Sequence, residues 1–201
     1  MNEPRQIPGP ALAMLDVSDI PRGLHMLDAL VKEAEITVLS AGTIHDGRYL
    51  VLFSGEVEPV VRAFDRARSV VGEALYDAVI LPWADERMAP AILDGTEGPH
   101  GRGDTLGVLQ TGSAPTLVRA LDAALKGAEV DLIQIRVADG LGGKAIATLC
   151  GETHDVEAAV DLGDRAARRG RPDGWSSVVI RNVDSAVLAR GGKPFHREWR
   201  G

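Results

Sequence analysis

The sequence predicts an α+β fold with two tandem ferredoxin-like domains, each a four-stranded antiparallel sheet with helices on one face. Three observations predict it. Residues 27–36 return as residues 121–130, 94 positions later, with six of the ten residues identical. Each copy shows the same order of short apolar runs and helical stripes: strand, helix, strand, strand, helix, strand. A glycine-rich stretch without an apolar pattern separates the copies.

The first copy opens with an apolar strand over Ala11–Val17, which Ser18 and Asp19 bring to an end. Pro21 suits the first turn of a helix that extends to about residue 33. The turn His45-Asp46-Gly47 is a tight hairpin signal. The other elements expected in this copy are strands at 36–43 and 48–54, a helix at about 57–72, a strand at 78–82 and a short helix at 86–93.

The second copy repeats this plan. Its expected elements are strand Thr105–Thr111, helix 115–126, strands 130–137 and 144–150, helix 155–169 and strand 177–180. The expected boundaries are an N-terminal extension at 1–9, a first domain at 10–94, a linker at 95–103, a second domain at 104–189 and a tail at 190–201.

Composition excludes several classes of function. The net charge is −7, and only 8 of 201 residues are aromatic (3 Phe, 3 Trp, 2 Tyr), which argues against nucleic-acid binding. A single cysteine, Cys150, excludes an internal disulfide and a cysteine-only metal site within one chain. The apolar runs are far shorter than a membrane span, and we expect neither a secretory signal nor contact with a membrane. No nucleophile-elbow or catalytic-cysteine pattern is present, so we expect no enzyme activity.

The repeated stretches together resemble the shell domain of bacterial microcompartments, the BMC domain. The resemblance rests on the opening strands at 11–15 and 106–109, the Ala-x-x-Lys-x-Ala helices at 29–34 and 123–128, and the Gly-Glu turns at 55–57 and 151–152. Each copy starts with the strand that precedes the lysine-bearing helix, which is similar to the unpermuted tandem members of that family.

The resemblance implies an architecture and a role. Three chains would supply six domains and form a pseudohexameric tile with a central pore, which would meet neighbouring hexameric and pentameric shell proteins edge to edge. The implied role is a structural one, in the cytoplasm at a microcompartment shell, where small metabolites or cofactors cross the pore. Some tandem members hold an iron–sulfur cluster on pore cysteines. Cys150 lies at the end of a strand, away from the pore hairpin, so we expect no resident cofactor and no metal.

The resemblance also assigns residues. The hairpin of the first copy would line the pore with His45, Asp46, Gly47 and Arg48, and that of the second copy with Asp139, Gly140, Leu141, Gly142 and Gly143. The second hairpin is longer and rich in glycine, so we expect it to be the more mobile one and to open or close the pore. Lys32 and Lys126 resemble the lysines through which neighbouring tiles meet.

Each of these features also has a simpler interpretation. His45-Asp46-Gly47 is a good hairpin turn in any protein, and both lysines could be ordinary exposed helical residues. Residues 140–144 resemble a phosphate loop only superficially, because a strand follows where a helix is required. The alternative function is a tandem ferredoxin-like regulatory protein that binds a small metabolite between its domains, since one fold serves many functions.

Overall fold

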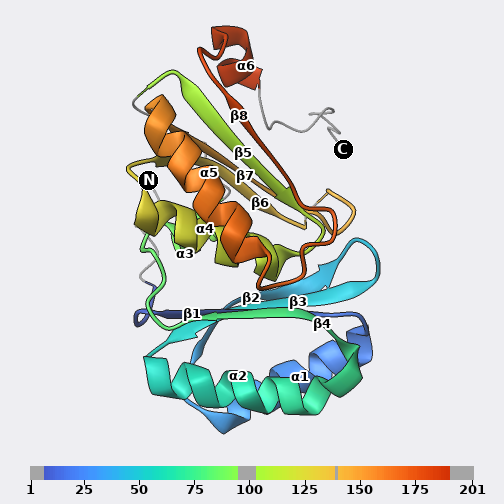
Figure 1. The fold of residues 1–201 in the computed structure, drawn as a ribbon. Coiled ribbons are helices and arrows are strands. Elements are labelled where there is room, and N and C mark those ends of the chain that lie inside the picture. Colours follow the sequence, from blue (N-terminus) through green and yellow to red (C-terminus); the bar gives the residue numbers. More distant parts are fainter. Residues whose placement is uncertain (1–6, 95–102, 139, 191–201) are drawn as a thin grey trace, which may run out of the picture.

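The computed structural model describes residues 7–94, 103–138 and 140–190, and it contains two domains of the same plan (Figure 1). The expected linker therefore lies, except for Gly103, outside the described residues, as does the tail beyond Arg190. In the first domain the elements are β1 (Ala11–Val17), α1 (Ile20–Glu33), β2 (Thr37–Ile44), β3 (Arg48–Gly55), α2 (Val57–Val71), the 3-10 helix η1 (Gly72–Ala74), β4 (Leu75–Leu81) and α3 (Met88–Asp94).

The second domain repeats these elements. They are β5 (Thr105–Thr111), α4 (Ala114–Gly127), β6 (Asp131–Val137), β7 (Ala145–Gly151), α5 (Thr153–Ala167), β8 (Ser176–Ile180) and α6 (Ser185–Arg190). Helix α6 is not among the expected elements, because its six residues are too few to show a helical stripe. Strand β4 begins three residues earlier than expected, since Leu75 already pairs with Val17.

Both sheets are antiparallel, which confirms the predicted fold class. The strand orders are β2-β3-β1-β4 and β6-β7-β5-β8, so the first strand of each domain lies in the middle of its sheet. The N-terminal caps of the first helices also correspond. The side chain of Asp19 accepts a hydrogen bond from the Arg22 amide, and that of Ser113, 94 positions later, accepts one from the Thr116 amide.

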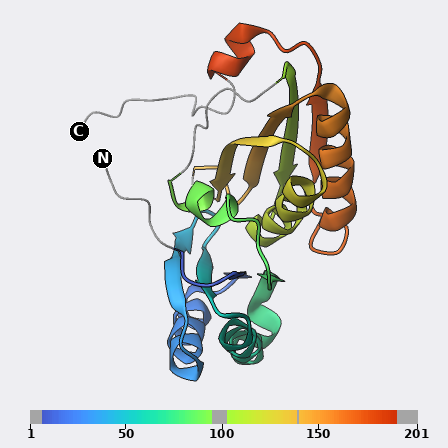
Figure 2. The same cartoon turned by 90° about the vertical axis from the view of Figure 1, so that its left-hand side faces the viewer.

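The first sheet is covered on both faces. Its inner face packs against α1 and α2 through a core that includes Leu15, Phe53 and Phe64. Helix α4 of the second domain packs against β1 and β4 on the outer face. Figure 2 shows α1 and α2 beneath the first sheet, on the side away from the second domain. The contact between the domains, which we call the in-chain junction, therefore joins α4 to the outer face of the first sheet.

Candidate functional site

The first hairpin joins β2 to β3 through an exposed turn. Asp46 and Gly47, in the three-residue turn between the paired Ile44 and Arg48, have φ of 78° and 71°, a left-handed backbone that Asp-Gly adopts readily in tight hairpins. The side chains of His45 and Asp46 are exposed, whereas the next residue, Arg48, is only 4% exposed. The turn predicted from the sequence is therefore present, and its last predicted pore residue points into the protein.

The second hairpin joins β6 to β7 and is built on glycine. Gly140, Gly142 and Gly143 all have positive φ, and the Ala138 amide donates to the Lys144 carbonyl oxygen at 3.0 Å to close the loop. Gly140 and Gly142 are exposed and Leu141 is half-buried, while Gly143 is buried. Asp139, which the resemblance also placed at the pore, lies outside the described residues.

Arg48 connects the two hairpins. Its Nη2 donates a hydrogen bond to the Gly143 carbonyl oxygen at 2.9 Å, across 95 residues of sequence. A Cβ added to Gly143 would lie 2.2 Å from the same nitrogen, so the close approach requires glycine. Both hairpins therefore lie on the same side of the chain, on the right in Figure 1. Arg48 fixes the end of the second hairpin to the base of the first.

A buried carboxylate neutralises Arg48. The Asp16 Oδ2 lies 3.2 Å from Nη1 of Arg48, and Asp16 is 0% exposed. Among the described residues, neither carboxylate oxygen of Asp16 accepts a hydrogen bond. Burial raises the pKa of Asp16 to about 7, and Arg48 only partly opposes that shift. The pair is therefore shielded from water, and its carboxylate is fully ionised only above about pH 7.

Further polar groups complete the in-chain junction beside this pair. Asp77, which pairs across the sheet with Asp16, accepts hydrogen bonds from the hydroxyl groups of Ser113 and Thr116 at the start of α4. A carboxylate at the N-terminus of a helix is also stabilised by the helix dipole. The guanidinium groups of Arg48 and Arg171 each lie 4.0 Å from the ring centre of Tyr76.

The two predicted edge lysines lie in different surroundings. Lys32 on α1 is exposed and pairs with Asp28 one turn earlier, at 2.7 Å. Lys126 on α4 forms the corresponding pair with Asp122, also at 2.7 Å, and in addition donates to the Trp83 carbonyl oxygen of the first domain. Lys126 therefore holds the in-chain junction as well as reaching solvent.

Arg87 is a residue of this junction that the sequence did not indicate. Its guanidinium group donates to the carbonyl oxygens of Leu125 and Val130, at 2.9 and 2.8 Å, and so caps the C-terminus of α4. It also binds Asp85, and this hydrogen bond holds the pKa of Asp85 below its usual value. The Asp85 amide in turn donates to Asp122 of α4 at 2.9 Å.

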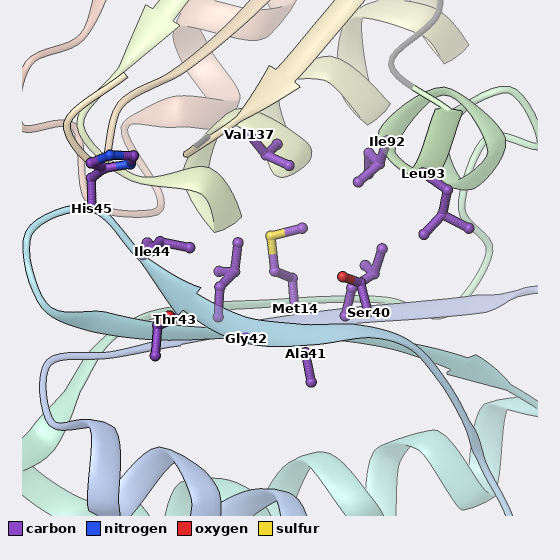
Figure 3. A pocket seen from close by; sticks show the side chains of 12 residues that line it. Met14, Ser40, Ala41, Gly42, Thr43, Ile44, His45, Ile92, Leu93 and Val137 are labelled. Carbon is purple, nitrogen blue, oxygen red and sulfur yellow. The ribbon is translucent and has the colours of Figure 1, made fainter. Parts of the chain in front are cut away.

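A pocket of about 630 Å³ lies between the domains beside the first hairpin (Figure 3). It is the place that a metabolite-binding regulatory protein would use. Its lining residues are Met14, Ser40, Ala41, Gly42, Thr43, Ile44, His45, Leu50, Leu52, Ile92, Leu93 and Val137. Among them His45 is the one titratable side chain, so a charged metabolite would find no strong counter-charge there.

Nothing in the described part of the chain forms a metal centre. No group of three or more His, Cys, Asp or Glu residues there is arranged to hold a metal ion. Cys150 is buried in β7, at the end of the strand away from the second hairpin, with its Sγ 3.7 Å from the Gly103 carbonyl oxygen. Within the described residues, no helix has the length and apolar character needed to cross a membrane.

The duplicated fold, the paired hairpins and the repeated helix lysines define a tandem-domain protein. The family model of the BMC domain matches residues 11–83 and 105–183. The chain belongs to the BMC domain family, as a tandem member of the microcompartment shell proteins, and the resemblance found in the sequence is confirmed.

Similar proteins agree with this assignment. The chain is 31% identical, over 175 residues, to the bacterial microcompartment shell protein PduT of Citrobacter freundii, covering 87% of this chain and 94% of that protein. A microcompartment protein from Desulfitobacterium hafniense DCB has a similar structure, with a TM-score of 0.75, 29% identity, and coverage of 89% and 98%. A fused permuted hexameric shell protein of the RMM microcompartment shares the fold, with a TM-score of 0.57 and 20% identity over 78% of this chain and 81% of that one.

Proposed function

We propose that three copies of this shell protein close into a ring of six domains, a non-enzymatic tile whose central pore passes small molecules. The observation that carries the proposal is a match between surfaces. Each chain exposes one helix face and one sheet face that correspond to the two faces already buried in its own junction. A chain with one free face of each kind forms head-to-tail contacts, and these end when a ring closes.

The free helix face is on α1. Leu24 is 52% exposed, whereas its counterpart on α4, Val118, is 0% exposed. Val31 is likewise exposed, while its counterpart Leu125 is buried. The two helices bury the same side against their own domain, so the difference comes from the contact of α4 with the first sheet.

The free sheet face is on β8. Val178 is 49% exposed, whereas Val79, which holds the same register on β4, is 1% exposed beneath α4. Ile180 and Leu81 differ in the same direction. Exposed apolar patches of this kind mark interaction sites. An α1 helix from a second chain fits this face as α4 fits the first sheet.

The first test is the mass of the native protein in solution. Three chains of 21.3 kDa give about 64 kDa, and two stacked rings give about 128 kDa. Replacing Val178 with aspartate puts a carboxylate into the apolar contact, so we expect light scattering to find the 21.3 kDa chain instead. The matched control is Val61→Asp, since Val61 is an exposed valine of α2 outside both faces. A wild-type monomer, or a Val178→Asp trimer, would contradict the ring.

We further propose that the two hairpins line the pore of this ring. Two observations support this proposal: both hairpins lie on the same side of the chain, and the Arg48–Gly143 hydrogen bond joins them. In a ring of three chains, six hairpins of the two kinds would then alternate around one axis. His45, Asp46 and Gly47 would face the opening from the first hairpin, and Gly140, Leu141 and Gly142 from the second. Arg48 and Gly143 would hold the hairpins together from behind, and the second hairpin would swing on its glycines to widen the pore.

The lysine on α1 gives a separate prediction about assembly beyond the ring. Lys32 is exposed, and exposed ion pairs add little stability, so Lys32→Ala should leave the 64 kDa species unchanged. We propose that the Lys32 ammonium group binds a neighbouring tile, and we therefore expect electron microscopy to show fewer extended sheets with this variant. Arg62→Ala, which removes a similar exposed pair on α2, is the control. Sheets of wild-type extent would exclude Lys32 from the edge contact.

A further inference from the structure

The polar residues of the in-chain junction have counterparts at the two free faces. At the free faces the carboxylate lies on the helix and the hydroxyl group on the sheet, the reverse of the in-chain junction. In the chain, the sheet supplies the carboxylate of Asp77, and the start of α4 supplies the hydroxyl groups of Ser113 and Thr116. On the free sheet face the position of Asp77 is held by Ser176, which pairs across the sheet with Gln110 as Asp77 pairs with Asp16.

On the free helix face the exchange runs in the opposite direction. The cap position of Ser113 is held by Asp19, and the position of Thr116 by Arg22. The carboxylate is therefore on the helix in one case and on the sheet in the other. When α4 meets the first sheet and α1 meets the second, neither contact places one carboxylate opposite another.

We propose that the contact between chains is this exchanged junction, in which the Ser176 hydroxyl donates to the Asp19 carboxylate of the next chain. The inference rests on the proposed ring and adds the residues that decide which faces pair. Each free face binds a second copy of this chain, with α1 of one chain against the second sheet of the next.

The exchange also excludes the wrong pairing. If α1 occupied the first sheet, the Asp19 carboxylate would take the place of the Ser113 hydroxyl against Asp77 and near Asp16, and Arg22 would take the place of Thr116. Asp77 would then lose the hydroxyl donor of Ser113 and face a like charge in a desolvated site. Like charges buried together oppose binding strongly, and proteins use such repulsion to reject incorrect partners. This mismatch favours α4 on the first sheet and α1 on the second, so that domains of the two kinds alternate around the ring.

The decisive experiment compares two variants that differ only at position 19. In the first variant, Ser176→Asp places on the second sheet the carboxylate that Asp77 supplies on the first, and Arg22→Thr removes the arginine of α1. Asp19 is kept, so two carboxylates face each other in the contact between chains. We expect the trimer dissociation constant to rise at least ten-fold, measured by light scattering over a dilution series. Adding Asp19→Ser completes the in-chain set and should restore the wild-type value. Serine is also a good helix cap, so α1 remains capped.

Cysteine pairs give a second measurement that does not depend on affinity. Asp19→Cys with Ser176→Cys should form disulfides between chains under mild oxidation and yield linked dimers and trimers on a non-reducing gel. Asp77→Cys with Ser113→Cys should link only within a chain, and Asp19→Cys with Asp77→Cys should not link chains. These pairs report contact directly.

The results separate this inference from the proposed function. A wild-type protein that is monomeric at all concentrations would contradict the ring itself. If the wild type is a trimer and the Arg22→Thr/Ser176→Asp variant assembles equally well, the ring stands and the exchanged junction is overturned. The same conclusion follows if Asp19→Ser fails to restore assembly and the 19–176 cysteine pair does not link chains.

Discussion

Replacing Arg48 with alanine is expected to lower the free energy of unfolding by about 3–5 kcal/mol at pH 8, the cost typical of removing one partner from a buried ion pair. Asp16 would remain at 0% exposure without its counter-charge. The Gly143 carbonyl oxygen would lose its hydrogen bond in the same variant. At pH 5 the loss should be smaller, because a protonated Asp16 tolerates burial without a cation.

Urea unfolding at one protomer concentration measures this effect, with Arg62→Ala as the control. Arg62 forms an exposed pair with Glu58, and such pairs contribute only about 0.3–0.5 kcal/mol. Hydrogen exchange provides a second result, since the amide groups near Gly143 should exchange faster once Arg48 no longer holds that hairpin. A loss below about 1 kcal/mol, instead of the roughly 3–5 kcal/mol typical of a broken buried ion pair, would contradict the prediction. It would show that the chain compensates for the missing guanidinium group.

Most of the fold could be predicted because it depends on local patterns that occur twice. The apolar run of β1, the cap at Asp19 and the Asp46-Gly47 turn each specify their own element. The errors lie where the pattern is weak. The charge of Asp77 interrupts the apolar run of β4, so the sequence does not show that the strand extends back to Leu75.

The candidate site was less predictable because its key contacts join distant residues. Arg48 follows a hairpin turn, and only the arrival of Gly143 from the other domain shows that its side chain is buried. The Lys126 contact with the Trp83 carbonyl oxygen is equally invisible in the local sequence. One signal was present, since Asp16 is a lone charge within an otherwise apolar strand. Comparing Asp19 with Ser113 across the repeat would also have revealed the exchanged caps.

The stability of the chain is expected to depend on pH through Asp16 with a sign opposite to that of most carboxylates. Burial raises the pKa of Asp16 to about 7, from an ordinary value of 3.8. The folded chain therefore keeps a proton that the unfolded chain releases above about pH 4. This contribution favours folding at low pH, is lost as the pH rises from about 4 to about 7, and is constant above that range. In the middle of the range the slope approaches about 1.4 kcal/mol per pH unit.

Asp85 has the opposite sign but acts outside this range. Its hydrogen bond with Arg87 lowers its pKa below 3.8, so the stability it contributes is present above that pH and is lost as the pH falls further. Between pH 5 and 7 Asp85 is ionised in both the folded and the unfolded chain. The slope in that interval therefore reports Asp16 once the contribution of all other groups is subtracted.

Comparing the wild type with Asp16→Asn performs that subtraction, because the other groups are the same in both proteins. Urea unfolding at pH 5, 6, 7 and 8, at one protomer concentration, should show a free energy of unfolding that falls with pH more steeply in the wild type, by about 1 kcal/mol per unit below pH 7. Asp161→Asn, which removes an exposed carboxylate of α5, should keep the wild-type slope. Parallel curves for the wild type and Asp16→Asn would mean that Asp16 is ionised in the folded chain throughout this range. The Arg48 ion pair would then outweigh the cost of burying Asp16.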